Sequence, residues 1–250
     1  NWLAAAEPAR PNILLAISDD QTWRHAGAYG DTVVSTPAFD RVAREGVLFN
    51  YGFCSTPSCS PSRAAILTGQ DFWRLKSGAN LFGALPNNHL VYPRLLEAAG
   101  YYVGHTGKAR AWNQKLSGRA KHPAGDAWNQ KRLKSVPAAG ISRIDYAGNF
   151  EAFLESRPRG KPFCFWYGSI EPHRFYEPGS GVRSGKNLND VIVPAFFPDV
   201  PQVRADILDY YVEIEWFDRH LARIIALLEE RGELDNTLIV VTSDHGMPFP

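Results

Sequence analysis

The sequence predicts an α/β fold in which helices cover a mostly parallel β-sheet. First, 250 residues with 44% hydrophobic side chains suffice for one large domain with a full core. Second, short apolar runs alternate with helical patterns along the chain. Third, these runs are almost continuously apolar, as in strands buried on both faces. Because such sheets place their sites beyond the carboxyl ends of the strands, residues that follow each run are the first functional candidates.

The first half of the chain supplies several of these elements. A strand is predicted at 12–18, where the run NILLAIS ends in an acidic pair. A helix at 37–45 follows, because the pair Thr36-Pro37 is favoured at a helix start and Gly46 at its end. The apolar segment 47–53 is the next strand candidate. Three more elements complete this half: helices at 62–67 and 92–99, the latter closed by Gly100, and a strand at 101–105.

The second half begins with an irregular basic region and then returns to the same alternation. The run 162–168 predicts a strand buried on both faces. From 205 to 231, apolar residues recur at three- and four-residue spacing, which indicates a long amphipathic helix ended by Gly232. A last strand is expected at 237–242, directly before Ser243-Asp-His-Gly246.

Acidic residues follow the first and the last predicted strand. Asp19 and Asp20 come after the first, and Asp244 with His245 after the last. An Asp pair after a strand is by itself often a turn or a helix cap. Two such clusters at matching strand ends bring like charges together, which a cation must offset. We therefore expect a divalent metal at this edge.

Overall charge gives no reason to expect nucleic acid or a membrane as a partner, because 27 Lys and Arg balance 26 Asp and Glu. The exception is the block 108–143, where nine basic residues accompany one acid. This block is either an anion-binding surface or a solvated loop. Three cysteines are too few for a disulfide framework, and Cys164 in its apolar run is expected to be a buried thiol.

The first ten residues are read as the remnant of an export signal or an N-terminal arm, because small alanines precede a polar residue. The chain has no Asn-X-Ser/Thr sequon, which is unusual for an exported eukaryotic enzyme of this size. The prediction is therefore a periplasmic or secreted bacterial protein, or a protein of a lysosome-like compartment if the source is eukaryotic.

The segment Cys59-Ser-Pro-Ser-Arg63, continuing to Thr68-Gly69, resembles the signature of the sulfatase family. The resemblance implies an alkaline-phosphatase-like α/β sandwich with a mostly parallel central sheet. It further implies that Cys59 is oxidised to formylglycine, the nucleophile, by a formylglycine-generating or anaerobic sulfatase-maturating enzyme. Arg63 would hold the modified residue and offset charge on the sulfate. The implied metal is most readily Ca²⁺, held by Asp19, Asp20, Asp244, His245 and the modified Cys59.

A second stretch, 100–108, looks like the second sulfatase signature, in which the lysine contacts sulfate. Lys108 inherits that role. The family usually carries a histidine two positions later, where this chain has Arg110. A guanidinium binds an anion but does not shuttle a proton near neutral pH, so Arg110 is assigned to substrate binding only.

The segment Glu171-Pro-His-Arg174 resembles the part of sulfatases that presents a histidine to the leaving group. His173 is then the general acid, and Arg174 binds a substrate carboxylate or sulfate. From Glu171 onward the resemblance is greatest to the N-sulfoglucosamine sulfohydrolases, the heparan N-sulfatases. One departure is His245, where those enzymes typically carry asparagine and other sulfatases histidine. Trp112 and Trp128 are further hypotheses for stacking on a sugar.

The expected substrate is a sulfated saccharide, most directly the N-sulfate of glucosamine. Three alternatives stay open: an O-sulfatase acting on another glycan or an aryl sulfate, a phosphonate or phosphodiester hydrolase, and an anion-binding relative whose Cys59 is never oxidised. We expect 11–250 to form the catalytic N-terminal domain and a smaller C-terminal domain to lie outside this chain. A homodimer is also left open.

Overall fold

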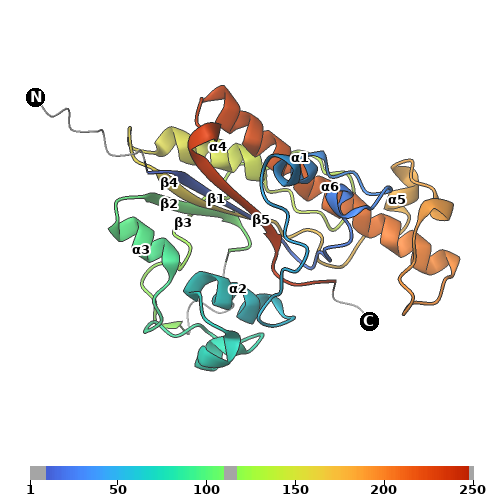
Figure 1. Ribbon diagram of the computed structural model, residues 1–250, viewed down its shortest axis with the longest axis horizontal. Coiled ribbons are helices and arrows are strands. Elements are labelled where there is room, and N and C mark those ends of the chain that lie inside the picture. The colour runs from blue at the N-terminus through green and yellow to red at the C-terminus, as the bar shows by residue number, and fades with distance from the viewer. Residues whose placement is uncertain (1–9, 110–116, 248–250) are drawn as a thin grey trace, which may run out of the picture.

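A parallel five-stranded sheet forms the centre of the molecule in the computed structural model, which describes residues 10–109 and 117–247 (Figure 1). Its strands are β1 (Asn12–Ser18), β2 (Tyr102–Gly107), β3 (Asp126–Ala127), β4 (Phe163–Gly168) and β5 (Thr237–Ser243). They lie in the order β3-β2-β4-β1-β5, and every adjacent pair is parallel. The predicted fold class is thus confirmed.

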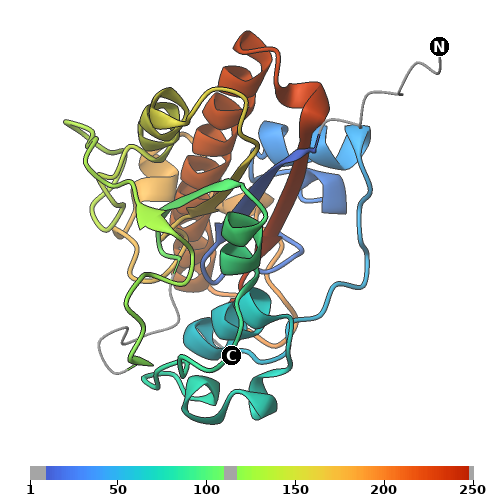
Figure 2. The same cartoon turned by 90° about the vertical axis from the view of Figure 1, so that its left-hand side faces the viewer.

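Helices cover both faces of this sheet. Their bounds are α1 (Pro37–Glu45), α2 (Cys59–Thr68), α3 (Tyr92–Ala98), α4 (Tyr146–Ser156), α5 (Ser180–Arg183) and α6 (Pro201–Glu230). Helices α1, α4 and α6 lie on one face, and α2 and α3 on the other (Figures 1 and 2). No helix within residues 10–109 and 117–247 is long and apolar enough to cross a bilayer.

The larger hydrophobic core lies between the sheet and α4 and α6. Aromatic rings fill much of it, with Phe150 and Phe153 of α4 against Phe163 and Phe165 of β4. A second core joins β1 and β4 to α2 through Leu15, Ile17, Ala64, Leu67 and Trp166. These two cores hold the ends of β1 and of α2 in a fixed relation, which positions the site described below.

The start of α1 is stabilised differently from the sequence expectation. Thr36 occupies the cap position, but its hydroxyl accepts from the Gly27 amide and donates to Asp40. The free amides of Ala38 and Phe39 are instead bound by Asp218 of α6, at 2.9 and 2.8 Å. A residue distant in sequence therefore serves as the cap.

The predicted strand at 47–53 is wrong, because this segment is irregular chain with a turn at 50–51 and forms no strand in the structure. Val47, Phe49, Tyr51 and Phe53 are between 71% and 90% exposed. Their alternation satisfies the sequence pattern of a strand, but no neighbouring strand within the described residues pairs with it. Helix α4 was not predicted; it lies between the basic block 108–143 and β4.

Candidate active site

The carboxyl ends of four adjacent strands converge on one edge of the sheet. Ile17 of β1 and Gly107 of β2 both pair with Gly168 of β4, and Ser18 of β1 pairs with Ser243 of β5. The next residues along the chain are Asp19, Lys108, Ser169 and Asp244. The register alone therefore brings together both predicted acidic clusters and the predicted sulfate-binding lysine.

Arg63 lies at the centre of this edge and is fully buried. Its Nε donates to Asp244 Oδ2 at 2.8 Å, and its Nη2 lies 3.4 Å from Asp19 Oδ1. A third contact is donated to the carbonyl of Lys108, whose own ammonium pairs with Asp19. Burial opposes ionisation of Asp244, but the adjacent Arg63 charge holds its pKa below the ordinary range.

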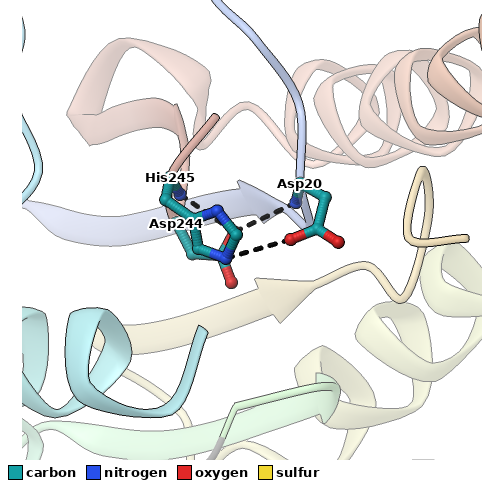
Figure 3. A group of neighbouring side chains, drawn as sticks. All are labelled: Asp20, Asp244 and His245. Atoms are coloured by element: carbon teal, nitrogen blue, oxygen red, sulfur yellow. Dashed lines mark hydrogen bonds and ion pairs between the residues drawn. The ribbon is translucent and has the colours of Figure 1, made fainter. Parts of the chain in front are cut away.

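Three side chains form a compact donor set at the same edge. Ligand atoms of Asp20, Asp244 and His245 lie within 4.8 Å of one another (Figure 3). His245 Nε2 is 2.9 Å from Asp20 Oδ1, and the Asp20 amide donates to Asp244 Oδ1 at 3.1 Å. Asp20 is one of two non-glycine residues with positive φ in the described chain, at 66°. This conformation turns its carboxylate toward the other two ligands.

This donor set fits a divalent cation. Carboxylate oxygens suit hard ions, and one imidazole is compatible with several divalent metals. Asp19 Oδ1 is also buried and makes no hydrogen bond among the described residues, although Arg63 Nη2 lies 3.4 Å from it. The fit to a cation therefore rests on Asp20, Asp244 and His245, whose ligand atoms converge.

Cys59 begins α2 and lies beside this set. Its thiol is partly buried and hydrogen-bonds His245, which lowers the pKa of the thiol against the opposing effect of desolvation. Burial by itself lowers the pKa of His245, but hydrogen bonds to Asp20 and Cys59 outweigh it and raise that pKa to about 10. The Ser62 hydroxyl donates to the Asp244 carbonyl and so ties the first turn of α2 to the end of β5.

His173 and Arg174 lie on the loop after β4, at the open side of the site. His173 Nε2 is 3.7 Å from Asp20 Oδ2, and its side chain is 45% exposed. Arg174 is held by both carboxylate oxygens of Asp206, and its guanidinium lies 4.8 Å from the centre of the Tyr176 ring. The structure thus brings His173 to the donor set and places Arg174 in an ion pair.

Sequence reasoning missed Glu171 as a buried support of this loop. Its carboxylate accepts from the Ser142 amide at 2.6 Å, from the Tyr146 hydroxyl at 2.9 Å and from Ser169. Its carbonyl accepts from the Asp19 amide at 3.0 Å. The only signal in the sequence was that Glu171 lies two positions before His173. A charged residue on such a loop is usually expected to be solvated rather than buried.

The basic block contributes less to the site than its charge indicated. Arg119 donates to the carbonyls of Pro86 and His89, and Arg143 to the carbonyls of Leu133 and Lys134. Trp128 packs on the ring of Phe153 at 5.8 Å between centroids, in the core beside α4. Arg110 and Trp112 lie outside the described residues.

Comparisons with known proteins identify similar chains of greater length. The sequence model of the family described as Sulfatase matches residues 11–249. Human N-sulphoglucosamine sulphohydrolase is 31% identical over 271 residues, covering 97% of this chain and 52% of that protein. Human N-acetylgalactosamine-6-sulfatase is 38% identical over 288 residues, covering 97% and 51%. The chain thus spans about half the length of these relatives.

A solved structure shows the same fold. The phosphonate monoester hydrolase of Agrobacterium radiobacter superimposes with a TM-score of 0.72, covering 95% of this chain and 63% of that one. Its sequence identity is 20%, so the similarity concerns the fold alone.

Proposed function

The chain belongs to the sulfatase family, and from this we propose that it carries the catalytic centre of a hydrolase that removes sulfate from a sulfated sugar. The observation that carries the proposal is the position of Cys59. The start of α2 sets this residue beside His245 and against the carboxyl ends of β1 and β5. The family signature and the metal-ligand candidates, far apart in sequence, therefore meet at one place.

The chain's own residues supply the charge pattern that such a reaction needs. Arg63 and Lys108 supply positive charge beside Asp19, and the Cys59 thiol hydrogen-bonds His245 of the metal-ligand candidates. A divalent cation, which we propose to be Ca²⁺, supplies positive charge that a sulfate oxygen can approach. A formylglycine at position 59 supplies a hydrated aldehyde whose hydroxyl serves as the nucleophile. Lys108 contacts the sulfate. Burial raises the pKa of Asp19 to about 6, and the charges of Arg63 and Lys108 limit this rise.

His173 acts as the general acid in this proposal. Its imidazole lies on the open side of the site, partly exposed and near Asp20. Cleavage of a sulfamate releases an amine, which departs only if its nitrogen is protonated. In its protonated form His173 would deliver that proton from Nε2, while its Nδ1 lies 2.6 Å from the Arg174 carbonyl.

We propose the N-sulfate of glucosamine as the bond cleaved. It is supported by the segment 171–174 and by similarity to the human N-sulphoglucosamine sulphohydrolase. An O-sulfatase activity is the second candidate, since the human N-acetylgalactosamine-6-sulfatase is 38% identical over a similar length. His245, typical of sulfatases other than the N-sulfatases, favours this second candidate.

Mass spectrometry at position 59 tests the reaction class. Protein purified from its own host should carry formylglycine in the peptide that spans Cys59. Unmodified cysteine in that protein would favour the non-enzymatic alternative, an anion-binding relative. The matched control is Cys54 in the same tryptic peptide, residues 45–63; it is exposed and lies outside the signature, and fragment ions should place the modification at position 59 and leave Cys54 unmodified.

Parallel turnover assays test the substrate class. N-sulfated glucosamine, N-acetylgalactosamine 6-sulfate, an aryl sulfate and an aryl phosphodiester are compared by kcat/KM on the same preparation. We expect the N-sulfated sugar to be preferred. Preference for either of the next two substrates would establish the O-sulfatase alternative, and preference for the last would assign the chain to phosphodiester hydrolysis.

The proposal also names partners and a compartment. A formylglycine-generating or anaerobic sulfatase-maturating enzyme must oxidise Cys59, and the saccharide is the only other partner required. We propose export to the periplasm or the medium, because sulfated glycans are extracellular polymers. Fractionation of the host cells checks this, and activity confined to the cytoplasm would contradict it.

A further inference from the structure

Asp20 is held in its left-handed conformation by a hydroxyl of α6. The Tyr210 side chain is fully buried, and its hydroxyl accepts from the Thr22 amide and donates to the Asp20 carbonyl, both at 3.0 Å. One group thus bridges two backbone positions and closes the loop over Gln21. The Gln21 amide is bound in turn by the Ser243 hydroxyl at 3.0 Å.

This bridge matters because Asp20 has a left-handed backbone conformation, which residues other than glycine adopt infrequently, although Asp tolerates it better than most. A φ of 66° is uncommon for a residue other than glycine and persists only where surrounding contacts impose it. The amide of Asp20 is fixed by Asp244, and its carbonyl by Tyr210. Together the two contacts set the peptide planes on both sides of Asp20, and hence the direction of its carboxylate.

We propose that Tyr210 is a positioning residue for the metal site: its hydroxyl orients Asp20 so that the Asp20 carboxylate faces Asp244 and His245. The inference rests on the metal site of the proposed function. Groups that orient metal ligands in this way commonly change metal affinity by 10- to 100-fold when they are removed. Tyr210 itself offers no ligand to the ion.

The adjacent Tyr211 provides a matched control. It is 2% exposed, and its hydroxyl donates to Asp31 at 2.7 Å and lies 2.9 Å from His25 Nδ1. Both tyrosines therefore anchor the segment after β1 from the same helix, with rings that pack on His25. Only Tyr210 contacts the backbone of a predicted ligand.

The test is a calorimetric titration of the metal-free protein with Ca²⁺, and in parallel with Mg²⁺ and Mn²⁺. Tyr210→Phe should weaken binding of the preferred ion by about tenfold or more, and Tyr211→Phe by less than about twofold. Both variants should lower Tm of the metal-free protein by a similar few degrees, since each loses buried hydrogen bonds. Stability alone therefore does not separate them, whereas metal affinity does.

Three results would overturn the inference. Unchanged affinity in Tyr210→Phe removes the positioning role while leaving the metal site intact. An equal loss of metal affinity in Tyr211→Phe would show that the effect comes from a general destabilisation of α6. A wild-type protein that binds none of the three ions overturns the metal site and the inference with it. If Tyr210→Phe does not fold, Tyr210→4-fluorophenylalanine fills the space of the hydroxyl without donating, and the same loss of affinity is expected.

Discussion

Two regions of this molecule bury ionisable side chains. In one region these side chains are charged and paired, and in the other they are neutral. At the carboxyl edge of the sheet, Arg63 contacts Asp19 and Asp244 directly, so buried charges are paired. In the middle of α6, Glu213 and His220 are as deeply buried, but among the described residues neither contacts a fully buried side chain of opposite charge.

The difference appears in their pKa values. Burial, with the nearby Glu171 carboxylate, raises the pKa of Glu213 to about 9. Burial, with the nearby Arg223 charge, lowers the pKa of His220 to about 3. Both groups are therefore neutral near pH 7, whereas Arg63 and Asp244 at the carboxyl edge of the sheet remain charged. A buried cluster that remains charged is the better indicator of a site for an ionic ligand.

The largest effect is expected from removing the central charge of the edge. Arg63→Ala leaves two buried carboxylates without their partner and should lower the free energy of unfolding by about 3–5 kcal/mol. Urea denaturation measures this. Arg44→Ala, at a side chain that is 67% exposed, is the control and should change stability by less than about 0.5 kcal/mol. Equal effects of Arg63→Ala and Arg44→Ala would show that the buried ion pairs at the sheet edge stabilise the fold no more than an exposed ion pair.

A smaller effect of the opposite sign is expected at Glu213. Its folded pKa of about 9 lies above the ordinary value of 4.5, so its contribution is present at low pH and is lost as pH rises through this interval. Glu213→Gln should therefore gain roughly 1–3 kcal/mol at pH 8 and nothing at pH 4. Denaturation at both pH values measures this, with the exposed Glu230→Gln of the same helix as control. A gain that is the same at both pH values would exclude titration as its cause.

His220 should make the wild-type protein sensitive to acid. Its folded pKa of about 3 lies below the ordinary 6.5, so the unfolded chain takes up a proton first and stability falls as pH drops below 6.5. The loss should reach about 2 kcal/mol at pH 5. His220→Gln should be less stable at pH 7 but lose this part of the slope between pH 7 and 5. An unchanged slope would show that other groups cause the acid sensitivity.

The strand ends were predictable from sequence because their signal is local. Each strand that Asp19 and Asp244 directly follow is a short apolar run, although β5, at the edge of the sheet, has one exposed face. The parallel topology then brings these residues together without further information. The short segment from Cys59 to Arg63 likewise begins a helix whose first turn faces this edge.

The supports of the site were not predictable because they depend on contacts between distant segments. Tyr210 reaches Asp20 across 190 positions, and Asp218 caps α1 across 180. The pattern of α6 shows which residues are buried but not which of their polar atoms meet the backbone of a loop. The strand prediction for 47–53 was wrong because an alternating apolar pattern indicates a strand but does not provide the neighbouring strand with which it must pair.

The smallest change in stability is expected at the ion pair of Arg174 and Asp206. The same ion pair also tests how far the substrate site extends. Both side chains are more than one third exposed, so Asp206→Asn should change stability by less than about 1 kcal/mol. Asp206 nevertheless holds both arms of the guanidinium, which fixes its direction. If Arg174 binds the anionic sugar from this pose, Asp206→Asn should raise KM severalfold with kcat unchanged.

The matched control is Asp199→Asn, which releases Arg204 from an ion pair of the same kind between two other loop and helix positions. It should leave KM unaltered. An unchanged KM in Asp206→Asn would exclude Arg174 as a substrate contact in this geometry and end the site at His173. A raised KM would extend the substrate site along the loop after β4, where the charged side chains form exposed ion pairs rather than buried ones.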